Sequence, residues 1–393
     1  MVATTDQFEY LTSPAGQTLL GEIADADPGT AQILQLGQKL RTRYPGEIVA
    51  AAMTLHELRV RARAKFSHAD EMFFTRAGYE QASSEIAARH RARRFSGLAR
   101  VADLCSGIGG DLIALAAVST VVAVDRDPLH LRMALANTGV YGLRTRVEVT
   151  EADVREFDLA GFDAAFIDPA RRSERGRFGA HTTEPPLDFC FGLVDRASAV
   201  AIKAAPGIEV EVVPPGWEIE FVADGRDLKE AVLWSPAFAA TERRATLLPA
   251  DESFLPVAGD AVPIASPGSM LLDPNPAITR SGLVEDLART LGAWKIDEQI
   301  AFLSLDRDPQ SIWARSLLVL ESMPWRIKDI AARLRALDIG AVDIRRRGLA
   351  GDVEQIRKQL KLKGTNRATV VMTRVGDQPW CLICRDPALD SNS

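Results

Sequence analysis

The chain has 393 residues, of which 47% are hydrophobic and 25% are charged, so it can form two or three ordinary globular domains. Its formal net charge of −6 excludes a protein that coats nucleic acid with its whole surface. No apolar run is long enough to span a bilayer, no signal peptide is visible, and the four scattered cysteines suit a reducing compartment. We therefore expect a cytoplasmic protein with no membrane partner.

Residues 1–95 are predicted to form a helical N-terminal domain. Apolar residues recur at helical spacing over 31–44 and 48–65, and a further helix is expected to begin at Ser13. Basic residues gather in this domain, and we interpret them as a solvated helix face in preference to a phosphate-binding one. They are Arg59, Arg61, Arg63, Lys65, Arg89, Arg91, Arg93 and Arg94.

Residues 96–258 are predicted to form an α/β domain, because short apolar runs alternate with helical stretches. This alternation is typical of a parallel sheet with helices on both faces. Helices are expected at 111–118 and 128–138. Strands are predicted at 101–104, 121–124, 147–150, 164–167 and 199–203. Later apolar runs at 217–223, 231–234 and 245–248 are expected to supply the remaining strands of a seven-stranded Rossmann-like sheet.

The first strand of this domain leads into a glycine-rich turn. Asp103 lies in the strand, Gly107 and Gly109 follow it, and the next strand ends at Asp125. Glycines let a ligand approach the backbone, a helix N-terminus offers free N–H groups, and a carboxylate at Asp125 can accept hydrogen bonds from a ribose diol. The pattern predicts a nucleotide-binding crevice.

The details of the turn favour a cationic ligand over a dinucleotide. The third glycine of the dinucleotide fingerprint is replaced by Leu112, and a carboxylate at Asp103 would repel a pyrophosphate. The segment resembles the opening motif of class I S-adenosylmethionine-dependent methyltransferases, whose cofactor has a sulfonium and an amino group. This resemblance implies a set of cofactor-binding residues: Ser83, Asp103, Cys105, Ser106, Gly107, Gly109, Asp125, Arg126, Asp153 and Val154.

A second motif, Asp168-Pro169-Ala170-Arg171, ends the fourth predicted strand. The carboxyl ends of parallel strands line one crevice, so Asp168 should lie beside the glycine turn. The motif resembles the Asp-Pro-Pro-aromatic motif of methyltransferases that act on exocyclic amines of bases, which implies that Asp168 and Pro169 are catalytic. Ala170 and Arg171 depart from it. The expected substrate-binding residues are Arg171, Arg172 and Phe178.

The span 79–172 resembles trimethylguanosine synthase, including residues 83–90 before the sheet, which in that family help to close the cofactor pocket. The tryptophan that stacks on a methylated cap guanine in that family falls at Arg171, so cap hypermethylation is not implied. Residues 137–143 resemble a segment of many RNA methyltransferases, and a helix is expected to end there at Gly139.

After a proline- and glycine-rich connection at 249–276, residues 259–393 are predicted to form a smaller α+β domain. Helices are expected at 283–291, 327–337 and 353–360. Strands are expected at 342–346, 368–373 and 380–384. Cys381 and Cys384 form a C-x-x-C pair, but residues three apart on a strand face opposite sides. We expect no metal there.

The C-terminal domain resembles the THUMP-like domain fused to bacterial methyltransferases, on residues 273–283, 344–348 and 360–364. Residues 326–374 include thirteen basic residues and only five acidic ones, although the whole chain is acidic. Such an excess suits the phosphates of structured RNA such as tRNA or rRNA. The expected RNA-binding residues are Arg345, Arg347, Arg357, Lys361 and Lys363.

The sequence thus predicts a methyltransferase that acts on an exocyclic amine of a base in structured RNA, with guanine N2 favoured and adenine N6 second. Two alternatives stay open. One is an RNA adaptor that binds the cofactor with weak or no catalysis, which Ala170 and Arg171 suggest. The other is a methyltransferase for a small molecule, with the C-terminal domain as a lid.

Overall fold

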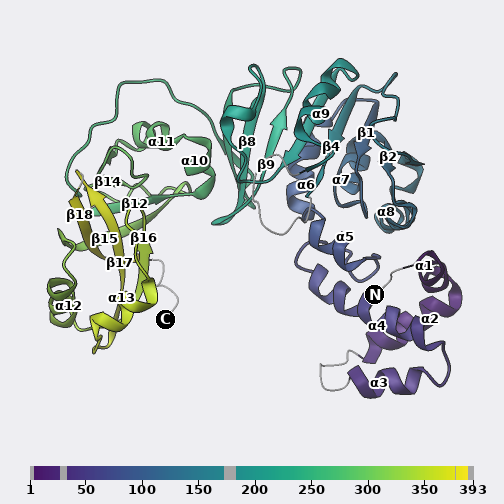
Figure 1. The fold of residues 1–393 in the computed structure, drawn as a ribbon, viewed down its shortest axis with the longest axis horizontal. Helices are drawn as coiled ribbons and strands as arrows, with labels where there is room; N and C mark the ends of the chain where they lie inside the picture. Colours follow the sequence, from purple (N-terminus) through teal and green to yellow (C-terminus); the bar gives the residue numbers. More distant parts are fainter. Residues whose placement is uncertain (1–3, 27–32, 172–182, 377, 388–393) are drawn as a thin grey trace. The chain divides into compact units, whose positions relative to one another are not determined.

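A computed structural model describes residues 4–26, 33–171, 183–376 and 378–387 (Figure 1). The chain divides into two compact units. The first unit runs to Ile219 and also contains Glu230–Glu242, and the second consists of Glu220–Lys229 and Arg243–Ser393. Each unit therefore uses two separate stretches of the sequence.

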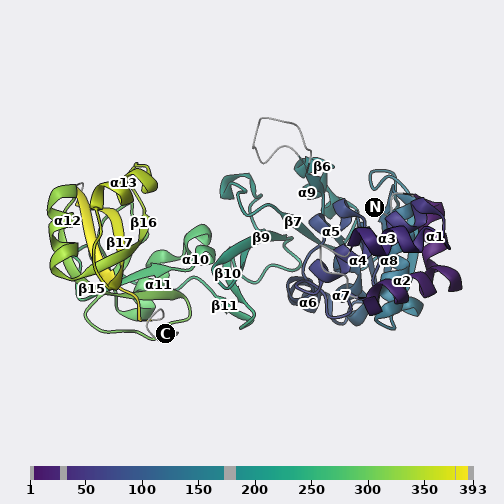
Figure 2. The same ribbon diagram turned by 90° about the horizontal axis from the view of Figure 1, so that it is seen from below.

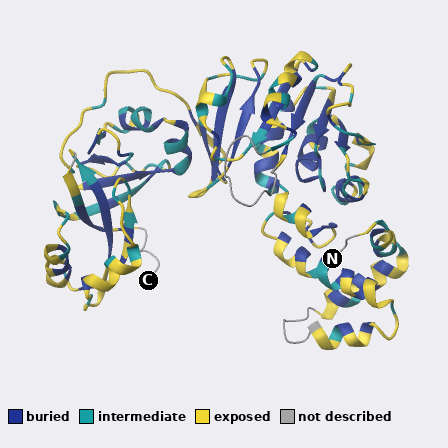
Figure 3. Cartoon of the chain, in the orientation of Figure 1, coloured by how far each residue is buried: buried dark blue, intermediate teal, exposed yellow. Residues whose placement is uncertain are grey.

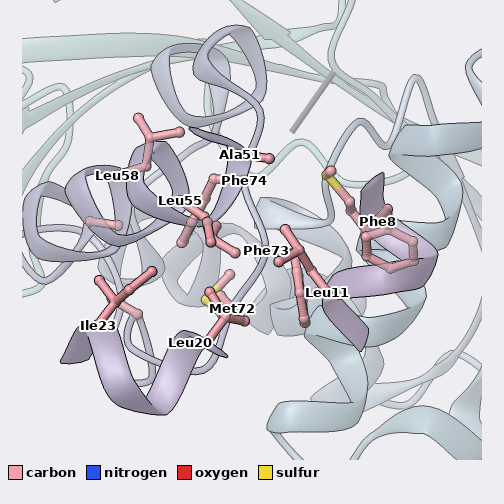
Figure 4. Close-up of a cluster of buried hydrophobic side chains, with 14 of the residues drawn as sticks. Phe8, Leu11, Leu20, Ile23, Ala51, Leu55, Leu58, Met72, Phe73 and Phe74 are labelled. Carbon is pink, nitrogen blue, oxygen red and sulfur yellow. The ribbon is translucent and has the colours of Figure 1, made fainter. Parts of the chain in front are cut away.

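The first unit begins with six helices. They are α1 (Thr5–Thr12), α2 (Pro14–Ala26), α3 (Ile33–Leu40), α4 (Gly46–Ala62), α5 (Arg76–Gln81) and α6 (Glu85–Ala92). Figure 4 shows side chains from α1, α2, α4 and the segment at Met72, Phe73 and Phe74 in one buried cluster. Ile108 of the glycine turn and Met133 belong to the same cluster. The N-terminal helices therefore share a core with the turn that they precede.

Two of the basic residues interpreted as a solvated face are buried, so that interpretation was wrong for them. Arg59 is 9% exposed and donates to the carbonyl oxygens of Met72 at 2.8 Å and Glu71 at 3.1 Å. Burial lowers its pKa to about 10. Arg91 is 1% exposed and forms ion pairs described below. Helical periodicity could not show that these guanidinium groups satisfy buried oxygens of other segments.

The sheet of the first unit has the strand order β9-β7-β4-β1-β2-β3. The strands are β1 (Arg100–Leu104), β2 (Thr120–Asp125), β3 (Val147–Glu151), β4 (Ala164–Ile167), β7 (Ala199–Ala204) and β9 (Asp227–Trp234). All neighbours are parallel except β7 and β9. Figure 3 shows β1, β2, β4 and β7 coloured as buried along most of their length, whereas only Val147 of the edge strand β3 is buried. The predicted α/β class is confirmed.

Helices α7 (Gly110–Val118) and α8 (Pro128–Val140) pack on β1, β2 and β3, and α9 (Leu187–Gly192) precedes β7. Helix α8 ends after the predicted Gly139, because the left-handed backbone that stops it is at Gly142, with φ 71°. Two short strands, β5 (Ala170–Arg171) and β6 (Thr183–Glu184), form an antiparallel pair. Single 3₁₀ turns occur at Arg93–Phe95, Arg144–Arg146, Leu193–Asp195 and Val210–Val212.

In the second unit, β10 (Arg243–Leu248) lies between β8 (Glu218–Asp224) and β11 (Glu252–Phe254). The expected irregular connection at 249–276 is only partly irregular, because it contains β11 and β12 (Met270–Pro274). Met270, Leu271 and Leu272 are buried. This apolar run is too short to stand out between the prolines and glycines around it.

The C-terminal sheet has the order β13-β14-β12-β15-β18-β17-β16, with parallel pairing only between β16 and β17. Its remaining strands are β13 (Trp294–Lys295), β14 (Leu303–Leu305), β15 (Ala314–Pro324), β16 (Ile339–Arg346), β17 (Asn366–Val375) and β18 (Gln378–Arg385). Its helices are α10 (Pro276–Ser281), α11 (Val284–Leu291), α12 (Ile327–Ala336) and α13 (Val353–Leu360). Figure 2 shows α12 and α13 beside β16 and β17.

Strand β18 separates the two hydrophobic clusters of this domain. Cys381 packs with the residues of α12 and α13, and Cys384 packs with Ile300 and Phe302 on the other side. The prediction that the two thiols face opposite sides is confirmed. In the part of the chain that the structure describes, no helix is long and apolar enough to cross a membrane.

Candidate active site

The turn after β1 has a backbone that favours glycine. Gly107 has φ 53° and Gly109 has φ 92°, both in the left-handed region. A Cβ atom on Gly109 would lie 3.1 Å from Cα of Ala134, so a larger residue would push α7 away from α8. Cys105 also has a positive φ of 61°, which is uncommon for a residue with a side chain and typical of functional turns.

Asp125 is fixed at the rim of this turn by backbone donors. Its Oδ2 accepts a hydrogen bond from the N–H of Gly107 at 2.9 Å, and its Oδ1 accepts one from Asp127 at 2.9 Å. The side chain of Asp127 in turn caps α8. Each carboxylate oxygen has a second lone pair, so Asp125 can still accept hydrogen bonds from a ribose diol.

Two buried polar atoms in the turn have no hydrogen-bond partner among the described residues. They are Asp103 Oδ2 and Ser106 Oγ. Burial raises the pKa of Asp103 well above its ordinary value, and the negative charges of Asp111, Asp168 and Asp125 add to this effect. A ligand with positive charge would offset the negative charges around Asp103, and its hydrogen-bond donors would pair with the two buried oxygens. The turn therefore fits a ligand with an ammonium and a sulfonium group.

A buried ion-pair network holds the first turn of α7. Arg91 pairs with Asp111 of α7 and with Glu230 of β9, and its Nε lies 3.1 Å from Asp111 Oδ1. Ser83 donates to Asp111 Oδ2 at 2.8 Å. Ser83 therefore reaches the first turn of α7, next to the glycine turn, through Asp111. The sequence carried no signal for Arg91 and Glu230, because they meet only in the folded chain.

Asp168 lies beside the glycine turn, as the parallel register requires. Strand β4 pairs with β1 up to Leu104 and Ile167, and the N–H of Asp168 donates to the carbonyl oxygen of Leu104 at 3.3 Å. On its other side, Lys203 Nζ donates to Asp168 Oδ2 at 2.6 Å. Lys203 was not predicted, although a charged residue near the end of a buried strand is the same signal that identified Asp168.

The chain has similarity to known proteins over most of its length. Two uncharacterised S-adenosylmethionine-dependent methyltransferases of Mycobacterium tuberculosis, from strains CDC 1551 and H37Rv, are 36% identical over 315 residues, which cover 78% of this chain and 86% of theirs. The chain belongs to the S-adenosylmethionine-dependent methyltransferases. Its cofactor is S-adenosylmethionine. This agrees with the negative charge around Asp103 and with the buried oxygens of Asp103 and Ser106 that lack a hydrogen-bond donor.

Family models describe parts of this methyltransferase. Residues 98–192 match the RNA cap guanine-N2 methyltransferase family, residues 314–386 match the THUMP domain-like family, and residues 4–62 match a domain family of unknown function. A crystal structure from Porphyromonas gingivalis W83, described as a methyltransferase, matches with a TM-score of 0.73 and 20% identity over 92% of this chain and 99% of that chain. This likeness shows the fold.

Asp153 of the methyltransferase follows β3, and its carboxylate is held by Arg155, two residues further along the chain. Arg155 donates to Asp153 from its backbone N–H at 2.9 Å and from Nη1 at 3.2 Å, and it also pairs with Glu184 of β6. Val154 is buried, and Arg126 after β2 is exposed. Arg155 thus connects the predicted adenine-binding acid to the β5–β6 pair. Of the expected substrate-binding residues, Arg171 ends β5, whereas Arg172 and Phe178 lie outside the described residues.

The expected RNA-binding residues of the methyltransferase fall into two environments. Arg345 and Arg347 lie on the same side of the chain and contact the carboxylate of Asp273, at 2.8 Å and 3.3 Å. Arg357, Lys361 and Lys363 are exposed, on α13 or just after it. Within the described ranges, no cluster of three or more His, Cys, Asp or Glu residues could hold a metal ion.

Proposed function

We propose that this methyltransferase modifies the exocyclic amine of a base in structured RNA, with guanine N2 favoured and adenine N6 second. The observation that carries the proposal is the position of Asp168 and Pro169, directly after β4 and beside the cofactor turn. The family match of residues 98–192 to RNA cap guanine-N2 methyltransferases supports guanine N2. A cap substrate is not part of the proposal, because Arg171 stands where that family has its stacking tryptophan.

The amine of a base is a poor nucleophile, because its lone pair is drawn into the ring. Hydrogen bonds from its two N–H groups to Asp168 Oδ1 and to the carbonyl oxygen of Pro169 would concentrate electron density on nitrogen and fix its direction. Bound S-adenosylmethionine supplies an activated methyl group. The nitrogen lone pair would form the new N–C bond to that methyl group as the C–S bond breaks and its electrons remain on sulfur, and the carboxylate of Asp168 would accept the proton that nitrogen loses.

The residues of the turn would hold the cofactor through complementary charge. Asp103 and Ser106 offer unpaired buried oxygens to the cationic part, and Asp125 offers carboxylate oxygens to the ribose. Asp153 would accept from the adenine amine. No covalent intermediate with the protein is required, since positioning and electrostatics can supply most of the rate for an activated methyl donor.

The THUMP-like domain would provide affinity for RNA. The exposed side chains of Arg357, Lys361 and Lys363 can reach backbone phosphates, whereas Arg345 and Arg347 are largely occupied by Asp273. The contacts would read the shape and charge of a structured RNA, and the target base would be presented in a flipped or single-stranded form.

The test compares modified nucleosides of tRNA and rRNA, by mass spectrometry, between a deletion strain and the same strain complemented with wild type or Asp168→Ala. A methylated guanosine or adenosine that disappears on deletion, returns with wild type and stays absent with Asp168→Ala supports the proposal. Calorimetry should show that the variant keeps its affinity for S-adenosylmethionine. An unchanged nucleoside profile with RNA binding intact would favour a cofactor-binding adaptor, and an unchanged profile without RNA binding would favour a small-molecule substrate.

A further inference from the structure

The pairing of Lys203 with Asp168 is built into the sheet. Strands β4 and β7 are parallel neighbours, with Ile167 opposite Ile202, so Asp168 and Lys203 follow side by side. The side chain of Lys203 is 15% exposed and that of Asp168 is 30% exposed. The 2.6 Å contact between Nζ and Oδ2 is therefore a largely desolvated, charge-assisted hydrogen bond at a position that the backbone fixes.

Lys203 is the cation that balances Asp168. The other charged groups that act on Asp168 are Asp111 at the start of α7 and Arg91 of α6, and Arg91 is committed to Asp111 and Glu230. Asp103 of β1 and Glu230 of β9 also lie in this group of interacting charges, and both are buried acids. Without Lys203, the carboxylate of Asp168 would face further negative charge with no cation of its own.

The contact also decides which oxygen of Asp168 remains for a substrate. Lys203 takes Oδ2, so Oδ1 and the carbonyl oxygen of Pro169 are left as two acceptors on adjacent residues. A primary aromatic amine presents two N–H donors in one plane. One amine therefore matches this pair of acceptors, provided that the carboxylate is ionised and does not rotate.

We propose that Lys203 is a positioning residue of the methyl transfer, which keeps the carboxylate of Asp168 ionised and turned so that Oδ1 receives the substrate amine. This inference rests on the proposed function and names a residue that it does not include. Burial raises the pKa of Asp168, and Lys203 offsets part of that rise. Burial lowers the pKa of Lys203, but the negative charges of Asp168, Asp111 and Glu230 together leave it above its ordinary value, so the ammonium persists at neutral pH.

The test compares the full-length wild type with Lys203→Met, Lys203→Gln and Lys203→Arg. Methyl transfer from radiolabelled S-adenosylmethionine to bulk RNA of the deletion strain is measured between pH 5 and 9. For Lys203→Met, kcat at pH 7 should fall by about 10-fold or more, and the acid limb of the kcat profile should move to a pH at least about one unit higher. Lys203→Arg should keep the limb near its wild-type position. An unmoved limb in Lys203→Met would overturn the proposal.

A second readout does not depend on activity. Carboxyl ¹³C NMR of aspartate-labelled protein, with the Asp168 signal assigned by its loss in Asp168→Asn, should show that the pKa of Asp168 is higher in Lys203→Met than in wild type. Lys203→Gln, which keeps a donor without the charge, replaces Lys203→Met if that variant does not fold. If wild type fails to methylate RNA, the proposed function fails, whereas an Asp168 signal that titrates identically in all variants sinks the role of Lys203 itself.

Discussion

The side-chain amide of Asn137 forms hydrogen bonds with both backbone polar groups of Phe73. The Oδ1 of Asn137 accepts from the N–H of Phe73 at 2.7 Å, and its Nδ2 donates to the carbonyl oxygen of Phe73 at 3.0 Å. The same Nδ2 donates to the carbonyl oxygen of Ile108 at 2.9 Å. A single fully buried amide thus joins the segment before α5 to the glycine turn.

Asn137→Ala should destabilise the first unit by about 1–3 kcal/mol, because it leaves buried backbone groups of Phe73 and Ile108 without partners. Hydrogen exchange with mass spectrometry should show faster exchange in peptides that contain these two residues. Arg132→Ala, on the exposed side of the same helix, serves as the control and should leave this exchange unchanged. Equal protection of these peptides from hydrogen exchange in Asn137→Ala and wild type would contradict the role of Asn137 in joining the two segments.

Asp103→Asn should make the cofactor-free protein more stable and weaken cofactor binding. The pKa of Asp103 is raised in the folded state, so its favourable contribution is present at low pH and is lost as the pH rises through that raised pKa. The melting temperature of the variant should therefore exceed that of wild type by a margin that grows as the pH rises above about 4, the ordinary pKa of an aspartate. Each kcal/mol of added stability should correspond to roughly 2–4 °C.

The same variant should respond less to the cofactor, because the neutral amide that replaces the Asp103 carboxylate has no charge to meet the sulfonium and ammonium groups. S-adenosylmethionine should raise the melting temperature of wild type more than that of Asp103→Asn. Asp195→Asn, at an exposed position in the same unit, should behave like wild type in both measurements. A variant with undiminished affinity would remove Asp103 from the cofactor site.

Asp273→Asn should destabilise the second unit. The buried carboxylate of Asp273 faces the guanidinium groups of Arg226, Arg345 and Arg347. We expect a loss of about 2–4 kcal/mol in urea unfolding, below the largest values for buried pairs because the arginines are partly exposed. The control is Asp343→Asn, since Asp343 is 52% exposed and contacts Arg345 alone among these arginines, and it should change stability by less than about 1 kcal/mol.

Lys361→Gln combined with Lys363→Gln should weaken binding to bulk tRNA without a change in cofactor affinity. Each lost phosphate contact should reduce the slope of log K against log salt concentration by about 0.7–0.9. Filter binding at several salt concentrations measures this slope. Lys39→Gln, an exposed lysine of α3, is the matched control. If the double variant and the control share the wild-type slope, the surface after α13 does not contact RNA.

The glycine turn and the position of Asp168 beside it could be predicted from the sequence for a definite reason. Both depend on short local patterns, an apolar strand that ends in an acid and a glycine turn, and a parallel sheet brings the carboxyl ends of such strands together. Lys203 could have been found by the same rule. Strand β12 could not, because only three apolar residues distinguish it from a loop.

Arg91 and Glu230 show what a local pattern cannot supply. They lie 139 residues apart, and each resembles an ordinary charged surface residue until tertiary structure buries both. The same holds for Arg345 and Arg347, whose basic cluster suggested RNA contacts. Their closeness to Asp273 depends on strand β12, which was not predicted, so the acid that they share could not be identified beforehand.

The hairpin tip at Gly225 and Arg226 belongs to the second unit but is separated from the rest of it in the sequence. Arg226 contacts Asp273, and Asn275 donates to the carbonyl oxygen of Gly225 at 2.8 Å. The second unit therefore includes Glu220–Lys229, which is separated from its main body at Arg243–Ser393 by Glu230–Glu242 of the first unit. A gene fragment that starts at codon 243, where the main body begins, would lack this hairpin. A cassette that carries the whole second unit must therefore begin at or before codon 220, and it then also carries Glu230–Glu242, which belong to the first unit.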